Sequence, residues 1–238
     1  VESVMKTSKR RGIDFFNPLK IYNKNEYIIQ EIENIIPKRE KIYVPIATDS
    51  YYEMPICRSR HSVFNFVDDK YYEFWHAFQK NQDFLLEAIK TFSDFENVGF
   101  FELFEKLIYS TEDPIIKAVA CLFLSRGGLT GELTSGPYIQ DINKCFDESF
   151  YERFKYFSLR DIIITQDDPL VVCKKGFVLQ TIPKLRRSLF HENHERKMYN
   201  DLLNNIKHGI VVSEGNNLRD KYKLLYEKEG LEILYMEQ

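Results

Sequence analysis

The chain has 238 residues, of which 44% are hydrophobic and 15% aromatic, so it can bury one substantial core or a core with a small satellite subdomain. A net charge of -3 excludes a global basic field, so any nucleic-acid contact must depend on a local patch or on a partner. The four cysteines lack paired spacing, which argues against a disulfide framework and favours a reducing, cytoplasmic setting, and no apolar run approaches the roughly 20 residues of a membrane span.

The first part of the chain alternates helix and strand patterns. Apolar residues recur at helical spacing over residues 27–36, and the apolar run 42–46 is typical of a strand. Residues 61–67 predict a second strand, and a helix over 71–78 extends toward residue 92. This order predicts an α/β fold with a parallel sheet that is covered on both faces.

The second part predicts helices first and mainly strands later. Residues 100–109 and 113–124 predict strong helices, and the glycine-rich stretch 126–137 predicts a loop. The remaining expected elements are a weak helix over 139–156, strands over 161–165, 176–179 and 209–213, helices over 194–207 and 218–229, and a last strand over 231–236.

Six segments carry a family resemblance through their order and spacing: 16–50, 63–78, 112–131 (EDPIIKAVACLFLSRGGLTG), 161–168 (DIIITQDD), 177–184 and 190–222. Together they resemble the Dam-type adenine-specific DNA methyltransferases. The resemblance implies a Rossmann-like S-adenosylmethionine-dependent methyltransferase fold, a doubly wound sheet with a small helical insertion. It implies a core over residues 13–96 and 158–238, and an insertion over 97–157 that resembles the DNA target-recognition subdomain.

The catalytic tetrapeptide of the family is replaced in this chain. Where the family has Asp, Pro, Pro and Tyr, this sequence has Thr181, Ile182, Pro183 and Lys184. Threonine is a poor acceptor for an adenine amino group, and lysine cannot stack on a flipped base as tyrosine does. The resemblance therefore implies that catalysis has been lost.

The positions that would bind the cofactor also depart from the family. After the first strand, Thr48, Asp49 and Ser50 replace the glycines that let the backbone approach a ligand. Phe66 replaces the acidic residue that receives ribose hydroxyls, and the segment from Lys20 lacks the family's glycine. We therefore expect no bound cofactor.

Other motif-like groups have simpler interpretations. Asp168 begins a partial Asp-Pro motif, but a second proline and an aromatic residue are missing. His191 and His194 precede a helix at a spacing more typical of a cap and a solvated face than of a metal site, so no metal is expected.

Four basic residues are candidates for DNA contact, although a solvated charge run is the alternative for the last three: Arg126, Lys184, Arg186 and Arg187.

The sequence thus predicts a pseudoenzyme: a non-catalytic methyltransferase-like subunit that binds a protein partner, such as an active methyltransferase of a restriction-modification or defence assembly, and contacts DNA. Two alternatives stay open. One is a divergent, active adenine-specific DNA methyltransferase that uses S-adenosylmethionine, and the other is a stand-alone DNA-binding protein. The family's terminal hairpin is expected to be missing, which would leave an edge strand open to a partner.

Overall fold

The computed structural model describes residues 16–19, 26–48, 50, 52–58, 60–94, 100–128, 133, 145–182, 192–214, 218, 222–228 and 231–237. The elements are α1 (Glu26–Ile35), β1 (Ile42–Ala47), α2 (Glu53–Cys57), β2 (Ser62–Phe66), α3 (Asp69–Ser93), α4 (Phe100–Ser110), α5 (Pro114–Gly127), α6 (Glu148–Tyr156), β3 (Ile162–Thr165), α7 (Pro169–Val172), β4 (Phe177–Ile182), α8 (Glu192–Asn205), β5 (His208–Glu214), β6 (Lys223–Lys228) and β7 (Leu231–Glu237). The predicted α/β class is confirmed. None of the helices in the described ranges is both long and apolar enough to cross a bilayer.

The strands form one mixed sheet in the order β3-β2-β1-β4-β5-β7-β6. β1 to β5 are parallel, and β7 runs antiparallel to both of its neighbours, β5 and β6. The order β3-β2-β1-β4-β5 is that of doubly wound sheets, in which the chain moves outward from β1 in one direction and then outward from β4 in the other.

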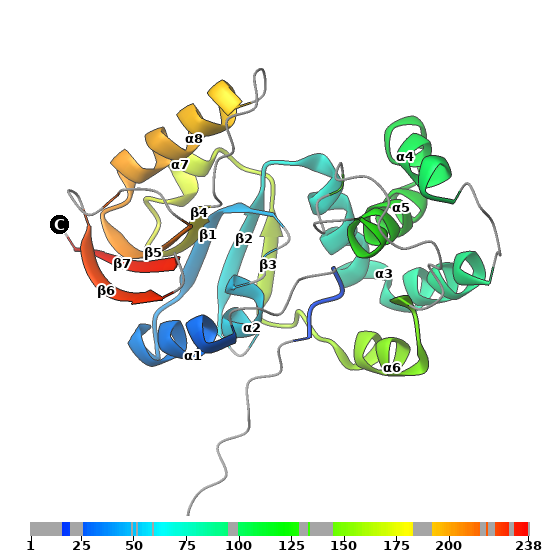
Figure 1. Ribbon diagram of the computed structural model, residues 1–238, viewed down its shortest axis with the longest axis horizontal. Helices are drawn as coiled ribbons and strands as arrows, with labels where there is room; N and C mark the ends of the chain where they lie inside the picture. The colour runs from blue at the N-terminus through cyan, green and yellow to red at the C-terminus, as the bar shows by residue number, and fades with distance from the viewer. Residues whose placement is uncertain are drawn as a thin grey trace, which may run out of the picture.

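Each face of the sheet packs against its own helices. On β4, Phe177 and Leu179 enter the core that contains α1 and α2, whereas Val178 and Ile182 enter the core that contains α8. This alternation follows from the two-residue period of a strand. Figure 1 shows α8 and α1 on opposite sides of the sheet. The expected covering of both faces is therefore confirmed.

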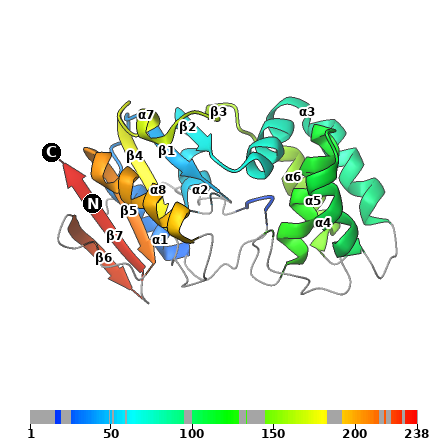
Figure 2. The same ribbon diagram turned by 90° about the horizontal axis from the view of Figure 1, so that it is seen from above.

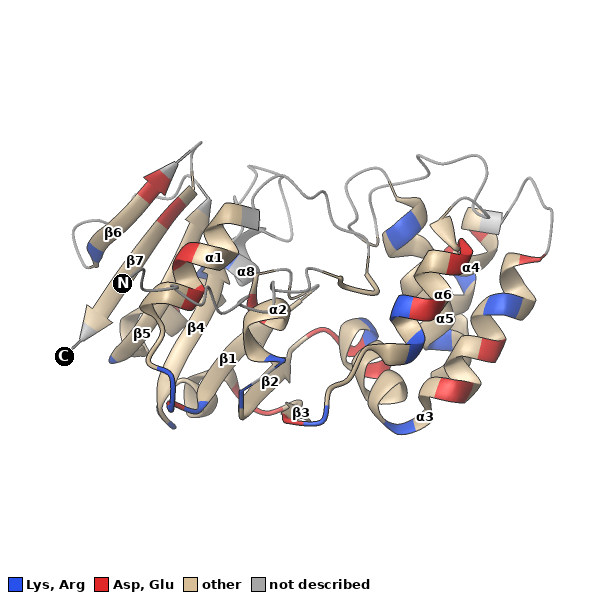
Figure 3. Ribbon diagram, turned by 90° about the horizontal axis from the view of Figure 1, so that it is seen from below, with Lys and Arg blue, Asp and Glu red and all other residues tan. Residues whose placement is uncertain are grey.

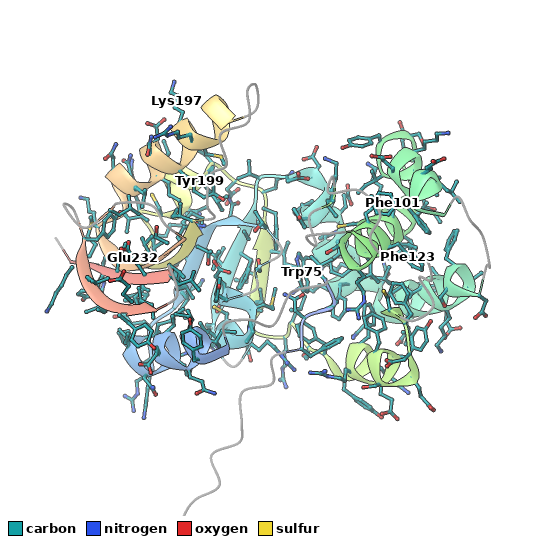
Figure 4. All side chains as sticks on the ribbon, viewed as in Figure 1. Trp75, Phe101, Phe123, Lys197, Tyr199 and Glu232 are labelled. Atoms are coloured by element: carbon teal, nitrogen blue, oxygen red, sulfur yellow. The ribbon has the colours of Figure 1, made fainter. Side chains whose placement is uncertain are left out.

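The helices α3 to α6 form a helical body beside the β3 end of the sheet (Figure 2). Its interior is a chain of aromatic contacts, with ring centroids 4.6 Å apart for Phe104 and Phe123 and 4.4 Å apart for Phe123 and Phe146. The buried Trp75 lies where this body meets the sheet (Figure 4). One continuous apolar core spans both parts.

Local signals explain where the helices of this body begin. Asp113 accepts hydrogen bonds from the backbone N–H groups of Ile115 and Ile116, and Pro114 occupies the first turn of α5. Asp147 caps α6 in the same way, so the described part of the predicted helix 139–156 begins at Glu148. The long helix α3 runs through a kink at Asn81 and packs against α5 and α6 as well as against β2 and β3.

The prediction for the end of the chain was right for the last strand, which is β7, and wrong for the helix before it. Within the helix expected over 218–229, Lys223–Lys228 form the strand β6, which pairs with β7 as an antiparallel hairpin. Leu224 and Tyr226 are partly buried, while Lys223 and Glu227 are exposed. Burial therefore alternates with the two-residue period of a strand, and the strand is stabilised by pairing with β7. The hairpin that we expected to be missing is therefore present.

Candidate functional site

The carboxyl ends of β1 and β4 form the position at which doubly wound folds bind ligands, because the chain leaves these two strands in opposite directions. The two strands are in register at Ile42 with Phe177 and at Tyr43 with Val178. β4 then continues beside β5 as far as Ile182. Beyond Tyr43 and Val178, side chains rather than ladder hydrogen bonds connect β1 and β4.

Gln180 makes this connection. Its side chain is fully buried, its Oε1 accepts a hydrogen bond from the N–H of Ile46 at 2.9 Å, and its Nε2 donates to the carbonyl of Ile46 at 2.8 Å and to that of Thr181 at 2.8 Å. A buried backbone N–H or carbonyl needs a hydrogen-bond partner. Where no neighbouring strand supplies the partner, a side chain can supply it. Gln180 thus connects β4 to β1 near the carboxyl end of β1. Gln180 was not predicted from the sequence, although a glutamine within an apolar strand was a usable signal.

Asn65 plays the same part on the β2 side. Its Nδ2 donates to the carbonyls of Pro45 and Asp167, both at 2.9 Å, and its Oδ1 accepts from the hydroxyl of Thr165 and the N–H of Asp167. The pairing of β1 with β2 has a register shift between Val44 and Ala47. The side-chain amides of Asn65 and Gln180 bind the backbone of this segment from the β2 side and the β4 side. Asn65 was also missed from sequence.

The first two positions of the replaced tetrapeptide are ordinary strand residues. Thr181 pairs with Val212 of β5, and its N–H donates to Oε1 of Glu53 at 2.9 Å. Glu53 lies in the first turn of α2 and is buried. The hydroxyl of Thr181 is buried and has no hydrogen-bond partner among the described residues, and Ile182 packs against α8. Pro183 and Lys184 lie outside the described residues.

The turn after β1 is formed without glycine. Ser50 is buried and has a φ of 58°, a conformation that favours glycine, and its carbonyl accepts the N–H of Met54 at 2.9 Å as α2 begins. Thr48 is exposed, and Asp49 lies outside the described residues. A side chain therefore sits inside the turn at Ser50, as the sequence implied.

The end of β2 presents an aromatic ring instead of a carboxylate. Phe66 is fully buried, lies opposite Ala47 of β1, and stacks on Phe64 with centroids 6.4 Å apart. The nearby acids have other partners, since Asp68 caps α3 through the N–H of Lys70 and Asp69 accepts a hydrogen bond from Gln166. Neither Asp68 nor Asp69 lies at the position of Phe66, where the family resemblance implies an acidic residue.

Arg126, a candidate for DNA contact, is held within the helical body. Its Nε donates to the carbonyl of Cys145 at 3.0 Å and its Nη1 to that of Pro18 at 3.1 Å, and the guanidinium lies 4.4 Å from the ring centroid of Phe150. Burial lowers the pKa of Arg126 to about 10. These contacts give Arg126 a structural role, and its contact with DNA stays a prediction. Lys20, Arg186, Arg187 and His191 lie outside the described residues.

The partial Asp-Pro motif is a helix start. Asp168 caps α7 by accepting a hydrogen bond from the N–H of Leu170 at 2.8 Å. Among the described residues, no group of three His, Cys, Asp or Glu side chains has an arrangement that could hold a metal ion.

Three of the four cysteines carry a buried thiol with a raised pKa. All four are free, and Cys57, Cys121 and Cys173 are buried. Burial raises the pKa of Cys57 to about 12 and raises the pKa of Cys121 and Cys173 as well. A thiol with a raised pKa is a poor nucleophile near neutral pH.

In comparisons with known proteins, no family model matches this chain and no curated protein matches its sequence.

Proposed function

We propose that this chain is a non-catalytic methyltransferase-like subunit, a pseudoenzyme that acts by binding a protein partner and contacts DNA as part of that assembly. The observation that carries the proposal is the hydrogen bonding of Gln180 to both backbone groups of Ile46. These two hydrogen bonds lie near the carboxyl end of β1, where doubly wound sheets bind their cofactors.

The surroundings of these hydrogen bonds support the loss of cofactor binding. The ring of Phe66 lies at the end of β2, the buried side chain of Ser50 lies in the turn after β1, and Glu53 binds the backbone of Thr181. A cofactor in this position would need all of these groups to move, and each is packed or hydrogen-bonded in its present place.

A methyl-transfer assay tests the non-catalytic part. Purified chain is incubated with tritiated S-adenosylmethionine and adenine-containing duplex DNA, and label in the DNA is counted. We expect no incorporation above that of a heat-denatured sample. Transfer of label to adenine would overturn the proposal in favour of a divergent, active methyltransferase.

Reconstitution tests the partner. The tagged chain is purified under native conditions from its own host, and the eluate is assayed for adenine methyl transfer and for composition. We expect a stoichiometric partner with methyltransferase activity, whose activity or thermal stability falls when the chain is removed. A chain that elutes alone and shifts duplex DNA by itself would favour a stand-alone DNA-binding protein.

A further inference from the structure

A hollow lies on the edge of the sheet where strands β1, β2 and β3 begin, opposite to the end at which Gln180 pairs with Ile46. It has a volume of about 570 Å³. We call it the amino-edge hollow, and its lining consists of Lys38, Arg39, Glu40, Lys41, Arg60, His61, Ser62, Arg160, Asp161 and Ile163. Hollows of roughly 300–1,000 Å³ are typical of sites for small ligands.

Backbone hydrogen bonds hold the three loops of this hollow together. The N–H of Ile42 donates to the carbonyl of His61 at 3.1 Å, and the N–H of Ser62 donates to the carbonyl of Asp161 at 3.0 Å. The loop before each strand is thereby tied to the loop before the next, so their side chains surround one space.

Arg60 adds a buried clamp. Its side chain is only 8% exposed, its Nη2 lies 2.8 Å from Oε1 of Glu33, and its Nη1 donates to the carbonyl of Pro37 at 2.9 Å. This clamp fixes the loop that carries Lys38, Arg39 and Lys41. The site is therefore preorganised by the fold, which lowers the entropic cost of binding.

The hollow is strongly basic in a protein with a net charge of -3. Five Lys and Arg side chains line it against two carboxylates, those of Glu40 and Asp161. Asp161 already has a neighbour in His61, whose Nδ1 lies 3.7 Å from Oδ1. Figure 3 shows Lys and Arg segments at the edge where β1 to β3 begin.

Four of these cations have their charge available. Lys38, Arg39, Lys41 and Arg160 are exposed, and none of them forms an ion pair within the described ranges. Lys41 has one weak contact, with its Nζ 5.5 Å from the ring centroid of Tyr43. The local field therefore favours an anion with several charges.

We propose that the amino-edge hollow binds phosphate groups, either of a small polyphosphorylated ligand or of a nucleic-acid backbone. One guanidinium group can donate two parallel hydrogen bonds to two oxygens of a phosphate. Arg39 and Arg160 are exposed in the hollow, and the lysines that line it add further positive charge. This inference does not rest on the proposed function, because the hollow lies at the amino ends of the strands and the pairing of Gln180 with Ile46 lies near the carboxyl end of β1.

Calorimetry with inorganic triphosphate tests the shared chemistry. The full chain is titrated at about 50 mM salt, where phosphate contacts are strong. Three proteins are compared: the natural chain, an R39Q/K41Q variant, and a matched control, K80Q/K106Q, which removes two exposed lysines of the helical body. We expect saturable binding, a loss of about tenfold or more in R39Q/K41Q, and no change in the control.

Anisotropy of a fluorescein-labelled DNA duplex separates the two sources. If the source is a nucleic-acid backbone, the duplex binds, triphosphate displaces it, and the log-log salt slope falls by roughly two in R39Q/K41Q. If the source is a small ligand, triphosphate binds and the duplex does not compete.

Three results would overturn the proposal. One is the absence of saturable binding of both probes, and another is equal affinity of R39Q/K41Q and the natural chain. The third is tighter binding of a polyglutamate peptide than of triphosphate, which would assign the hollow to an acidic protein segment. Circular dichroism of each variant verifies that it is folded before it is titrated.

Discussion

The amide of Gln180 on β4 pairs with both the N–H and the carbonyl of Ile46 on β1, at 2.9 and 2.8 Å, across 134 positions of sequence. This is the geometry of one step of a β ladder, made by a side chain instead of a strand. It connects the two strands where a doubly wound sheet would otherwise separate.

Replacing Gln180 with leucine tests this connection. The variant removes an acceptor and a donor and leaves two buried backbone groups of Ile46 without partners, so the free energy of unfolding should fall by about 2–4 kcal/mol. Urea unfolding measures the change. The matched control is Q30L, on the exposed side of α1, which should stay within about 0.5 kcal/mol of the natural chain. Equal stability of Q180L and Q30L would contradict the prediction.

Glu53 should be replaceable by glutamine but not by alanine. Its Oε1 accepts the N–H of Thr181, and glutamine keeps an oxygen at that position. We expect E53A to lose about 2 kcal/mol of unfolding free energy and E53Q clearly less, as thermal or urea unfolding would show. If both variants lost the same amount, the hydrogen bond to Thr181 would not be the reason for burying Glu53.

Alkaline pH should destabilise the protein through Cys57. Burial raises its pKa from 9.0 to about 12, so the unfolded chain releases this proton before the folded chain does. The thiol leaves stability unchanged below pH 9, and the free energy of unfolding then falls as the pH rises toward about 12. At pH 10 the loss relative to pH 8 should be roughly 1 kcal/mol larger in the natural chain than in C57A. Parallel pH profiles of the two proteins would disprove this.

Replacing Arg126 should lower the stability of the fold. Removal of the guanidinium leaves the carbonyls of Cys145 and Pro18 without their donor and removes the contact with Phe150. R126A should lose about 2 kcal/mol in urea unfolding, and R126K should recover little of it because lysine lacks the planar fork. The control is R196A, which changes an exposed residue of α8 and should be neutral. A stable R126A that fails to bind DNA would instead make Arg126 a contact residue.

The parallel strands were predictable because their own residues carry the signal. Ile42, Ile162 and Phe177 begin short apolar runs of the type that a sheet covered on both faces requires. β6 was mistaken for a helix, since Leu224 and Tyr226 become buried only when β7 lies beside them. The local sequence does not contain that neighbour.

The pairing of Gln180 with Ile46 shows the same limit more sharply. Departures at Thr181, Ser50 and Phe66 were expected from the sequence, because the family that the chain resembles has an acid, a glycine and an acid at these positions. The hydrogen bonds of Gln180 and Asn65 could not be predicted from the sequence, because their backbone partners are distant along the chain. A hydrogen bond of this kind is set by the packing of strands, and composition and periodicity do not record it.

The most direct test of the central claim is calorimetric titration of the natural chain with S-adenosylmethionine, with Q180A in parallel. Since the amide of Gln180 pairs with both backbone groups of Ile46 near the carboxyl end of β1, we predict no saturable heat for the natural chain at ligand concentrations up to about 1 mM. A Kd of about 1 mM corresponds to about 4 kcal/mol of binding free energy. Binding of S-adenosylmethionine by the natural chain with a Kd near 1 μM, about 8 kcal/mol, would contradict the claim.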